Sequence, residues 1–394
     1  MTNKLNKYDY FVIFLIASLC AGEFGGSLQM ARVMGILLIP FLLKTIPTIP
    51  KYITKQPRLF AVTILSWSFL SLAWTSSFDR GLEEFVYFFV HMLYFMEIVT
   101  FAFKSNKKIM SISVGWAIAV LFTSVVAAWE IQTGQHLITS KMQEDKVMFT
   151  GFVRRFASST FYNFNDYEVF LCYSVPFLLA AIMTIKKWKN TFFFFFSLLC
   201  VMVIVIFNAS RGASISVIIM LVVGLGGIIN QGLVPRKSLV VMILLLAFIL
   251  YKYSSDIFMN LTARLETASI TESSRTDIWY LALLCLENTM YIGTGIAGIE
   301  KGMSVVSNNY LAPHNLFIEI LVEFGVFILA YIIVILYKMV RHTIRGDSQY
   351  KGIIISVFIA WPIISIVSSK YLLCPDLYAF IASLYILVYN EKYA

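Results

Sequence analysis

Residues 313–325 read Pro313-His314-Asn315-Leu316-Phe317-Ile318-Glu319-Ile320-Leu321-Val322-Glu323-Phe324-Gly325. His314 is one of only four histidines, and it stands where a long polar loop re-enters a hydrophobic helix, followed by carboxylates at Glu319 and Glu323. Neutral and charged imidazole lie close in energy near pH 7, so an ionisable group at a membrane surface is the first place to look for chemistry. This junction is therefore the first candidate for a functional site.

The composition around this stretch is that of a membrane protein. Of the 394 residues, 59% are hydrophobic and 13% are charged, and the mean hydropathy is +0.80. A soluble domain with this balance would expose large apolar patches. The formal net charge of +9 would suit nucleic acid, but the charges lie in short loops, as membrane topology predicts, so we expect no nucleic-acid partner.

Apolar runs long enough to span a bilayer occur about twelve times, because a spanning helix needs roughly 20 apolar residues. We therefore expect an all-α, polytopic membrane protein with about 12 transmembrane helices, forming a single domain over residues 1–394. The apolar run that ends at Cys20 resembles a signal peptide, but Leu19 is not the small residue that a lipoprotein site needs, so we interpret this run as the first span. The expected spans are 9–22, 28–46, 59–75, 83–103, 109–129, 167–185, 191–208, 212–230, 239–255, 315–337, 352–369 and 375–390.

The lysines and arginines predict the orientation. If the spans alternate, 19 of the 31 fall on one side, in the segments that include both termini, so both termini should be cytoplasmic. The other 12 fall on the outer face, where topology does not require them, and they call for a functional explanation. They include Arg32, Arg80, Arg154, Arg155, Arg211, Arg264 and Arg275.

Two external loops stand out, at residues 130–166 and 254–313. Within the second, Thr271 to Asn288 predicts an amphipathic helix on the membrane surface, with Ser273 or Ser274 as its cap. The sequence from Tyr291 to Gly295 then predicts a turn that needs the backbone freedom of glycine.

Among the outer arginines, Arg211 has the clearest sequence context for an anion site. Asn208-Ala209-Ser210-Arg211-Gly212 separates two apolar runs with almost no loop, which predicts a tight hairpin with Ser210 as the N-cap of the following helix. A guanidinium beside unpaired backbone N–H groups at a helix N-terminus makes an anion site. A snorkelling interfacial arginine is the alternative interpretation.

Other candidates have similar alternatives. Arg275 precedes Trp279 by four residues and could instead pair with Asp277 or Glu272 at the surface. Arg154 and Arg155 could attract anionic headgroups, whereas Asn165 and Asp166 could cap the next helix.

Several familiar motifs are missing from the sequence. It contains no H-E-x-x-H, no G-x-S-x-G around Ser210, no P-loop, no dinucleotide fingerprint and no D-x-D pair. A metal-free active site without a cofactor is the simpler expectation.

Three patches together resemble the O-antigen ligase and O-antigen polymerase family of bacterial membrane glycosyltransferases. The matching residues are Ser210-Arg211-Gly212, then Arg275 with Ile278-Trp279, Ala282, Glu287-Asn288 and Gly293-x-Gly295, then His314-Asn315 with Leu316-Phe317, Glu323 and Gly325. The segment from Arg154 to Asp166 is a weaker match. The family often has Asn-Pro where this chain has Asn288-Thr289, which removes a helix stop but no chemical group.

The resemblance implies a GT-C-like fold in the bacterial cytoplasmic membrane, with the site on the external face. The donor would be a glycan on undecaprenyl diphosphate, with Arg211 and Arg275 binding the diphosphate and His314 activating the acceptor hydroxyl. A chain-length regulator and a flippase are expected partners. The candidate substrate-binding residues are Arg154, Arg155, Asn165, Asp166, Trp279, Asn315 and Glu319.

The expected function is polymerisation of lipid-linked oligosaccharide repeat units into O-antigen, capsule or exopolysaccharide by a metal-independent, inverting glycosyltransferase. One alternative is a ligase that moves finished polysaccharide to lipid A core or another acceptor. A second is a lipid or polysaccharide transporter, for which Arg32 and Glu97 near or within spans are the relevant residues.

Overall fold

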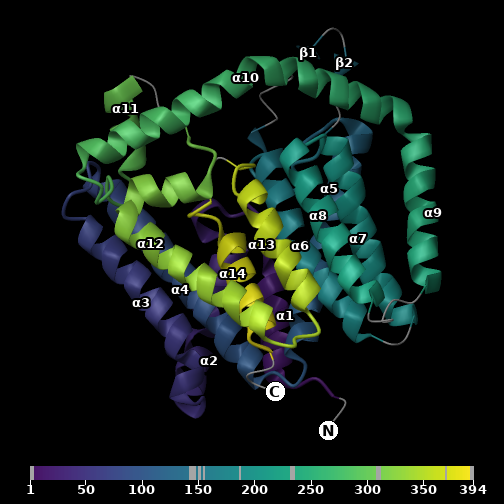
Figure 1. Ribbon diagram of the computed structural model, residues 1–394, viewed down its shortest axis with the longest axis horizontal. Helices are drawn as coiled ribbons and strands as arrows, with labels where there is room; N and C mark the ends of the chain where they lie inside the picture. Colours follow the sequence, from purple (N-terminus) through teal and green to yellow (C-terminus); the bar gives the residue numbers. More distant parts are fainter. Residues whose placement is uncertain are drawn as a thin grey trace.

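In the computed structural model the chain forms a bundle of helices with one long helix, α10, lying across its upper end (Figure 1). The structure describes residues 4–141, 148–149, 152–153, 156–185, 188–230, 236–307, 312–368 and 371–390. The helices are α1 (Lys7–Ala17), α2 (Met30–Thr45), α3 (Lys51–Ser71), α4 (Phe78–Lys104), α5 (Lys108–Thr133), α6 (Phe164–Thr184), α7 (Trp188–Asn208), α8 (Arg211–Asn230), α9 (Arg236–Lys252), α10 (Ser254–Asn288), α11 (Ile299–Ser307), α12 (Leu316–Arg345), α13 (Lys351–Ile364) and α14 (Pro375–Val388). The described ranges also contain three short 3-10 helices, η1 (Ser18–Ala21), η2 (Gly26–Leu28) and η3 (Ile46–Thr48), and a hairpin of two short strands, β1 (Met148–Phe149) and β2 (Phe152–Val153).

A helix lies at each of the twelve expected spans, but the helices differ in length. Six described helices are long and apolar enough to cross a membrane, and a bent pair, Ile243–Lys252 with Ser254–Thr262, could add a seventh. Three further apolar helices, Arg211–Gly227 within α8, α13 and α14, are shorter than a full span. The all-helical, multi-pass architecture is therefore confirmed, and twelve spans stays a prediction.

The loops gather at two opposite ends of the bundle. At the end that carries both termini (Figure 1), Asn6 Nδ2 donates to the Lys104 carbonyl at 2.8 Å and Lys104 Nζ donates to the Thr48 carbonyl at 2.9 Å. Lys108 Nζ donates to the Asn390 carbonyl at 3.4 Å at the same end. These segments are among those that alternating spans placed on one side.

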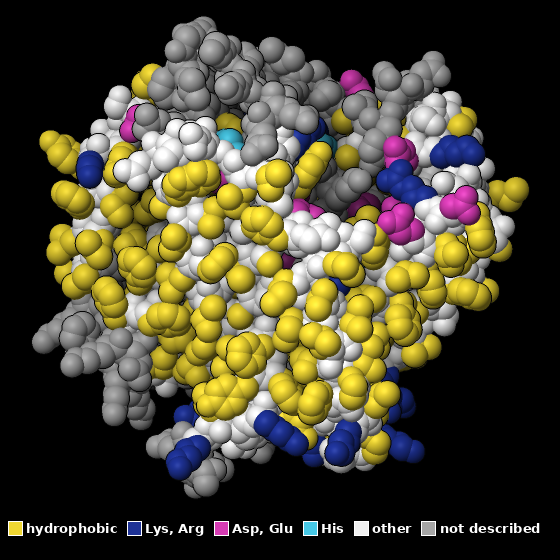
Figure 2. Space-filling view, turned by 180° about the vertical axis from the view of Figure 1, so that it is seen from behind, with side chains coloured by type: hydrophobic (Ala, Val, Ile, Leu, Met, Phe, Trp, Pro, Cys, Tyr) yellow, Lys and Arg dark blue, Asp and Glu magenta, His cyan; other side chains and the backbone are white. Residues whose placement is uncertain are grey.

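The opposite end is held together by other loop contacts. Glu23 N donates to the Thr160 carbonyl at 2.9 Å, and Trp279 Nε1 donates to the Pro313 carbonyl at 2.7 Å. Figure 2 shows a broad apolar band between the two ends, with Lys and Arg along its lower edge and mixed charges nearer the top. This distribution is typical of a protein embedded in a bilayer.

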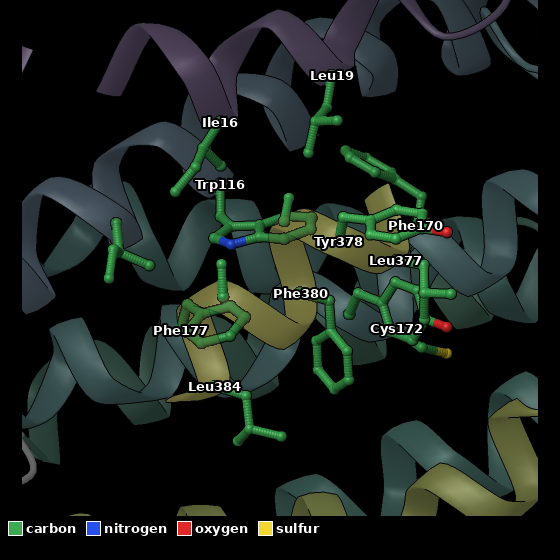
Figure 3. Close-up of a cluster of buried hydrophobic side chains, with 14 of the residues drawn as sticks. Ile16, Leu19, Trp116, Phe170, Cys172, Phe177, Leu377, Tyr378, Phe380 and Leu384 are labelled. Carbon is green, nitrogen blue, oxygen red and sulfur yellow. The ribbon is translucent and has the colours of Figure 1, made fainter. Parts of the chain in front are cut away.

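Helix α6 forms the centre of the bundle. Every residue from Tyr167 to Met183 is buried, as expected for a helix that is apolar on all faces. Around it, the ring of Trp116 stacks on Phe177 with centroids 5.6 Å apart, and Tyr173 stacks on Phe380 at 4.2 Å (Figure 3 labels Trp116, Phe177 and Phe380). Packing on all sides fixes α6, and α6 carries Asp166 in its first turn at the upper end.

Helix α10 corrects the expectation for the second external loop. The helix begins at Ser254 rather than Thr271, and the predicted caps Ser273 and Ser274 lie inside it. The sequence from Ser254 to Asn288 contains no glycine or proline, so nothing stops a helix there although its polarity is that of a loop. A bend of 70° separates the end of α9 from the start of α10, which turns the chain across the bundle (Figure 1).

Helix α12 is interrupted at Gly325, where φ is 80° and ψ is 179°. The break frees carbonyl groups of the preceding turn, and the loop after α10 binds them: Thr294 N donates to the Val322 carbonyl at 2.8 Å and Gly295 N to the Glu323 carbonyl at 3.0 Å. A Cβ on Gly325 would lie 2.4 Å from the Ile292 carbonyl, so only glycine fits this approach. The predicted glycine turn is confirmed, and it fixes the upper part of α12.

Candidate active site

His314 is positioned by the residues on either side of it. The Trp279 indole of α10 holds the carbonyl of Pro313, and the Asn315 side chain caps α12 by accepting from Phe317 N at 3.0 Å. The backbone of His314 has φ of 47°, a left-handed conformation that turns the chain sharply into the helix. The imidazole is therefore fixed between α10 and the start of α12.

A turn after α13, residues 365–368, is the common neighbour of the predicted site residues. The carbonyl of Ser365 accepts from Leu316 N at 2.9 Å, which ties the start of α12 to this turn. The carbonyl of Ile366 accepts from Arg275 Nη1 at 3.3 Å. Arg275 and the start of α12 thus meet at adjacent residues of the 365–368 turn.

Arg211 lies beside the same turn. Helix α8 begins at Arg211, and the Ser210 carbonyl accepts the first helical bond, from Ser214 N at 2.9 Å, so Ser210 occupies the predicted N-cap position. A Cβ on Gly212 would lie 2.9 Å from Val367 Cγ2, so glycine lets α8 approach the turn closely. The Arg211 side chain is exposed at this helix N-terminus.

Asp166 contacts the end of the same turn. Ser368 Oγ donates to Asp166 Oδ1, and Asn163 Nδ2 donates to Asp166 Oδ2 at 2.6 Å. The Asn163 side chain accepts from Asp166 N and is the cap of α6. The alternative that Asn165 or Asp166 caps α6 is therefore wrong. Asn165 lies half-buried in the first turn of α6.

Tyr371 holds the 365–368 turn in shape, and the sequence did not reveal it. Its hydroxyl accepts from Val367 N at 3.0 Å and Ser368 N at 2.8 Å, and donates to the Ile364 carbonyl at 2.6 Å. Its own backbone N donates to Glu319 Oε2 at 3.1 Å. A tyrosine in an apolar segment gives no local signal of this role, because its partners become visible only when α12 and α13 are placed side by side.

The electrostatic surroundings keep His314 neutral. Burial, with the neighbouring Arg275 guanidinium, lowers the pKa of His314 from the ordinary 6.5 to about 4, although a hydrogen bond to the Ser368 backbone acts in the other direction. Nδ1 has no hydrogen-bond partner among the described residues. An imidazole with one engaged and one unengaged nitrogen is able to accept a proton at neutral pH.

The other outer-end arginines differ in their surroundings. Arg32 Nε donates to His91 Nε2 at 3.2 Å, and Arg80 pairs with Glu300 and, at 3.4 Å, with Glu84. Arg154 and Arg155 lie outside the described residues. In the ranges that the structure describes, no group of three His, Cys, Asp or Glu side chains is arranged to hold a metal ion.

An apolar groove adjoins the site. It starts at Leu316, Phe317 and Leu372 next to His314 and continues along α12 to Met339, with α3, α4, α13 and α14 supplying the other walls. The groove therefore joins the membrane interior of the protein to its polar end.

The geometry defines a class of protein: a multi-pass membrane protein whose polar site, rich in arginine and histidine, adjoins an apolar groove at one end of the bundle. Residues 195–333 match the family model described as O-antigen ligase, a range that contains Arg211, Arg275 and His314. The resemblance to the O-antigen ligase and polymerase family is thereby confirmed.

One curated relative can be named. The chain is 20% identical over 322 residues to the teichuronic acid biosynthesis protein TuaE of Bacillus subtilis (strain 168), an alignment that covers 75% of this chain and 63% of that protein. The chain thus spans less than two thirds of the length of this relative. No solved structure matches the chain.

Proposed function

We propose that the protein is a metal-independent, inverting glycosyltransferase that polymerises undecaprenyl diphosphate-linked oligosaccharide repeat units at the outer face of the bacterial cytoplasmic membrane. The main support for this proposal is one turn, residues 365–368, around which lie Arg275, His314 and the N-terminus of α8 with Arg211. The family match and a relative named for teichuronic acid biosynthesis support polysaccharide assembly as the process.

The arginines suit the leaving group. When the bond between the sugar carbon and the diphosphate oxygen breaks, negative charge grows on the diphosphate, and fixed guanidinium groups stabilise that charge. Arg211 stands at the N-terminus of α8, and the positive end of the helix dipole there favours the same anion. In this proposal the two arginines do what a metal ion does in many other transferases.

His314 suits the acceptor. The acceptor hydroxyl oxygen forms the new bond to the sugar carbon, and its proton passes to a neutral imidazole as the lipid diphosphate departs. The lowered pKa of His314 keeps the ring available as a base, and general base catalysis contributes about 10² to 10⁴-fold. Trp279 and Asn315 position the ring through Pro313 and the start of α12.

The apolar groove could hold the polyprenyl chain of the lipid carrier. A polyprenyl chain would lie along α12, which lines the groove from Leu316 to Met339, and its headgroup would meet the polar site at the groove end. The end of the bundle where Lys and Arg follow the edge of the apolar band would face the cytoplasm, which would put the 365–368 turn on the external side.

A ligase is the second candidate, because the matching family model is described as O-antigen ligase. Donor chemistry would be the same, and the acceptor would differ. Loss of a polymerase leaves single repeat units on the final acceptor, whereas loss of a ligase leaves finished polymer on the lipid carrier. Deletion of the gene and analysis of both glycan pools distinguishes the two functions.

The test of the site uses purified protein with lipid-linked repeat unit in the presence of EDTA. We expect a ladder of products from the wild type, and a rate lower by about 10²-fold or more for Arg211→Ala, Arg275→Ala and His314→Ala. Arg80→Ala is the matched control, because it removes an outer-end arginine that pairs with Glu300. Wild-type rates in the three site variants, each present at normal membrane levels, would refute the assignment.

A further inference from the structure

A polar cavity lies on the Asp166 side of the 365–368 turn. Its lining comes from segments far apart in the sequence: the connection between α1 and α2, the first half of α6, and the approach to α14. Its interior has room for about two water-sized groups beneath an open mouth. The polar side chains that matter here are Glu23, Gln29, Asp166, Tyr173, Ser368 and Asp376.

Two of these side chains are buried with an unused polar atom. Tyr173 is 0% exposed, and its hydroxyl has no hydrogen-bond partner among the described residues. Gln29 is 4% exposed; its Nε2 donates to Glu23 Oε2 at 2.7 Å, whereas its Oε1 has no partner within the described ranges. An unpaired buried polar group destabilises the fold, so both atoms favour a hydrogen-bonding occupant.

The chemistry of the lining selects the kind of occupant. Glu23, Asp166 and Asp376 contribute carboxyl groups to the lining, and Arg32, the neighbour of the lining residue Ala31, is close enough to interact electrostatically with Glu23. Carboxylates and the Gln29 carbonyl oxygen accept hydrogen bonds, so the cavity suits a neutral group that donates several of them. The hydroxyl groups along one edge of a sugar have this character.

The backbone around the cavity holds this arrangement tightly. A Cβ on Gly22, whose φ is 51°, would lie 2.4 Å from the Thr160 carbonyl, and the next residue, Glu23, donates its N–H to the same carbonyl at 2.9 Å. The backbone of Glu23 is therefore fixed against the segment that leads into α6, and its carboxylate accepts from Gln29 Nε2.

Ser368 connects the cavity with the proposed active site. Its hydroxyl donates to Asp166 inside the cavity, and its backbone is hydrogen-bonded to His314. Arg275 binds the Ile366 carbonyl two residues earlier in the same turn. A sugar edge in the cavity would thus be linked to His314 through Ser368, and a diphosphate at Arg275 would lie beside the same turn.

We propose that this cavity is the acceptor subsite, in which Tyr173, Gln29 and the carboxylates Glu23, Asp166 and Asp376 bind hydroxyl groups of the acceptor sugar. The inference rests on the proposed glycosyltransferase function and adds the place and the chemistry of the second substrate. Tyr173 and Gln29 are then specificity-determining residues.

The experiment compares Tyr173→Phe and Gln29→Leu with Tyr167→Phe as the matched control. Tyr167 lies on the same helix, is also 0% exposed and does not line the cavity. The probe is the saccharide released by mild acid from the lipid-linked material of the source bacterium lacking this protein. Calorimetry measures its binding, and the rate of its glycosylation gives KM and kcat for the acceptor.

We expect Kd and KM for the saccharide to rise about three- to tenfold in Tyr173→Phe and Gln29→Leu, since each loses one hydrogen bond, with kcat within about twofold of the wild type. Tyr167→Phe should match the wild type. Unchanged Kd and KM in both cavity variants, or a wild type that does not bind the saccharide, overturns the subsite and leaves a water-filled cavity. Binding that depends on Tyr173 without any transfer supports the subsite but overturns the proposed glycosyltransferase.

Discussion

His314 sits in a left-handed backbone conformation, with φ of 47°, between a buried proline and the cap of α12. Histidine tolerates this conformation better than branched residues do. Its position therefore depends on backbone contacts made by Trp279 and Asn315, and its chemistry on the neighbouring Arg275. Position and reactivity can be tested separately.

The pKa of His314 predicts a dependence of stability on pH. The pKa is about 4 in the folded protein and 6.5 when the group is free, so between these values the unfolded chain binds more protons than the folded one. Stability should therefore fall as the pH is lowered from about 6.5 to 4, and His314→Gln should lose this part of the fall. Unfolding midpoints in detergent at several pH values check this, and identical pH profiles for both proteins would contradict it.

Tyr371 offers a contrast with Tyr173. Removing the Tyr371 hydroxyl leaves two buried N–H groups, those of Val367 and Ser368, without their acceptor. We expect Tyr371→Phe to destabilise the protein by about 1–3 kcal/mol and to lower kcat by disturbing the 365–368 turn. Tyr173→Phe, which removes an unpartnered hydroxyl, should not lower the unfolding midpoint. A midpoint lowered equally in both variants would show that the turn does not depend on Tyr371.

At the scale of elements, α12 is two helical pieces joined at Gly325. The loop after α10 binds the carbonyl groups freed at this break, so the break connects α10 to the helix that follows His314. Gly325→Ala would force a Cβ to within 2.4 Å of the Ile292 carbonyl at a backbone conformation that is almost exclusive to glycine.

We expect Gly325→Ala to cost about 1–3 kcal/mol and to reduce activity without touching a site residue. Gly226→Ala in α8 is the matched control, because a Cβ at that position meets no atom within 4 Å. Thermal unfolding in detergent measures both. A Gly325→Ala protein as stable as the control would mean that the contact between the loop after α10 and the break in α12 does not stabilise the fold.

The helices also differ in how well the sequence predicts them. Long apolar runs predicted the helices of the bundle, since hydropathy depends only on local composition. The predicted start of α10 was wrong because the polar first half of this helix has the composition of a loop. The lack of glycine and proline is the feature of the sequence that indicates a helix there. Arg211, Arg275 and His314 could be selected from the sequence, but Ser368 and Tyr371 could not, because their roles are set by contacts between helices.

At the scale of the whole molecule, the two ends of the bundle differ in charge (Figure 2). The orientation we propose puts the Lys-rich end in the cytoplasm. Introduced cysteines test it: in a variant without native cysteines, Met290→Cys, at an 85% exposed position near the site end, should react with an impermeant maleimide added to intact cells. Lys44→Cys, in the last turn of α2 at the other end, should react only after lysis. The reverse pattern would place the site on the cytoplasmic side.

The central claim is that one lipid diphosphate binds between Arg211 and Arg275 beside His314. Cryo-electron microscopy of the full chain with undecaprenyl diphosphate measures this most directly. The account predicts phosphate density within hydrogen-bond reach of both guanidinium groups at the 365–368 turn, with the polyprenyl chain entering the groove along α12. A headgroup bound elsewhere, with Arg211 and Arg275 both away from it, would contradict the account.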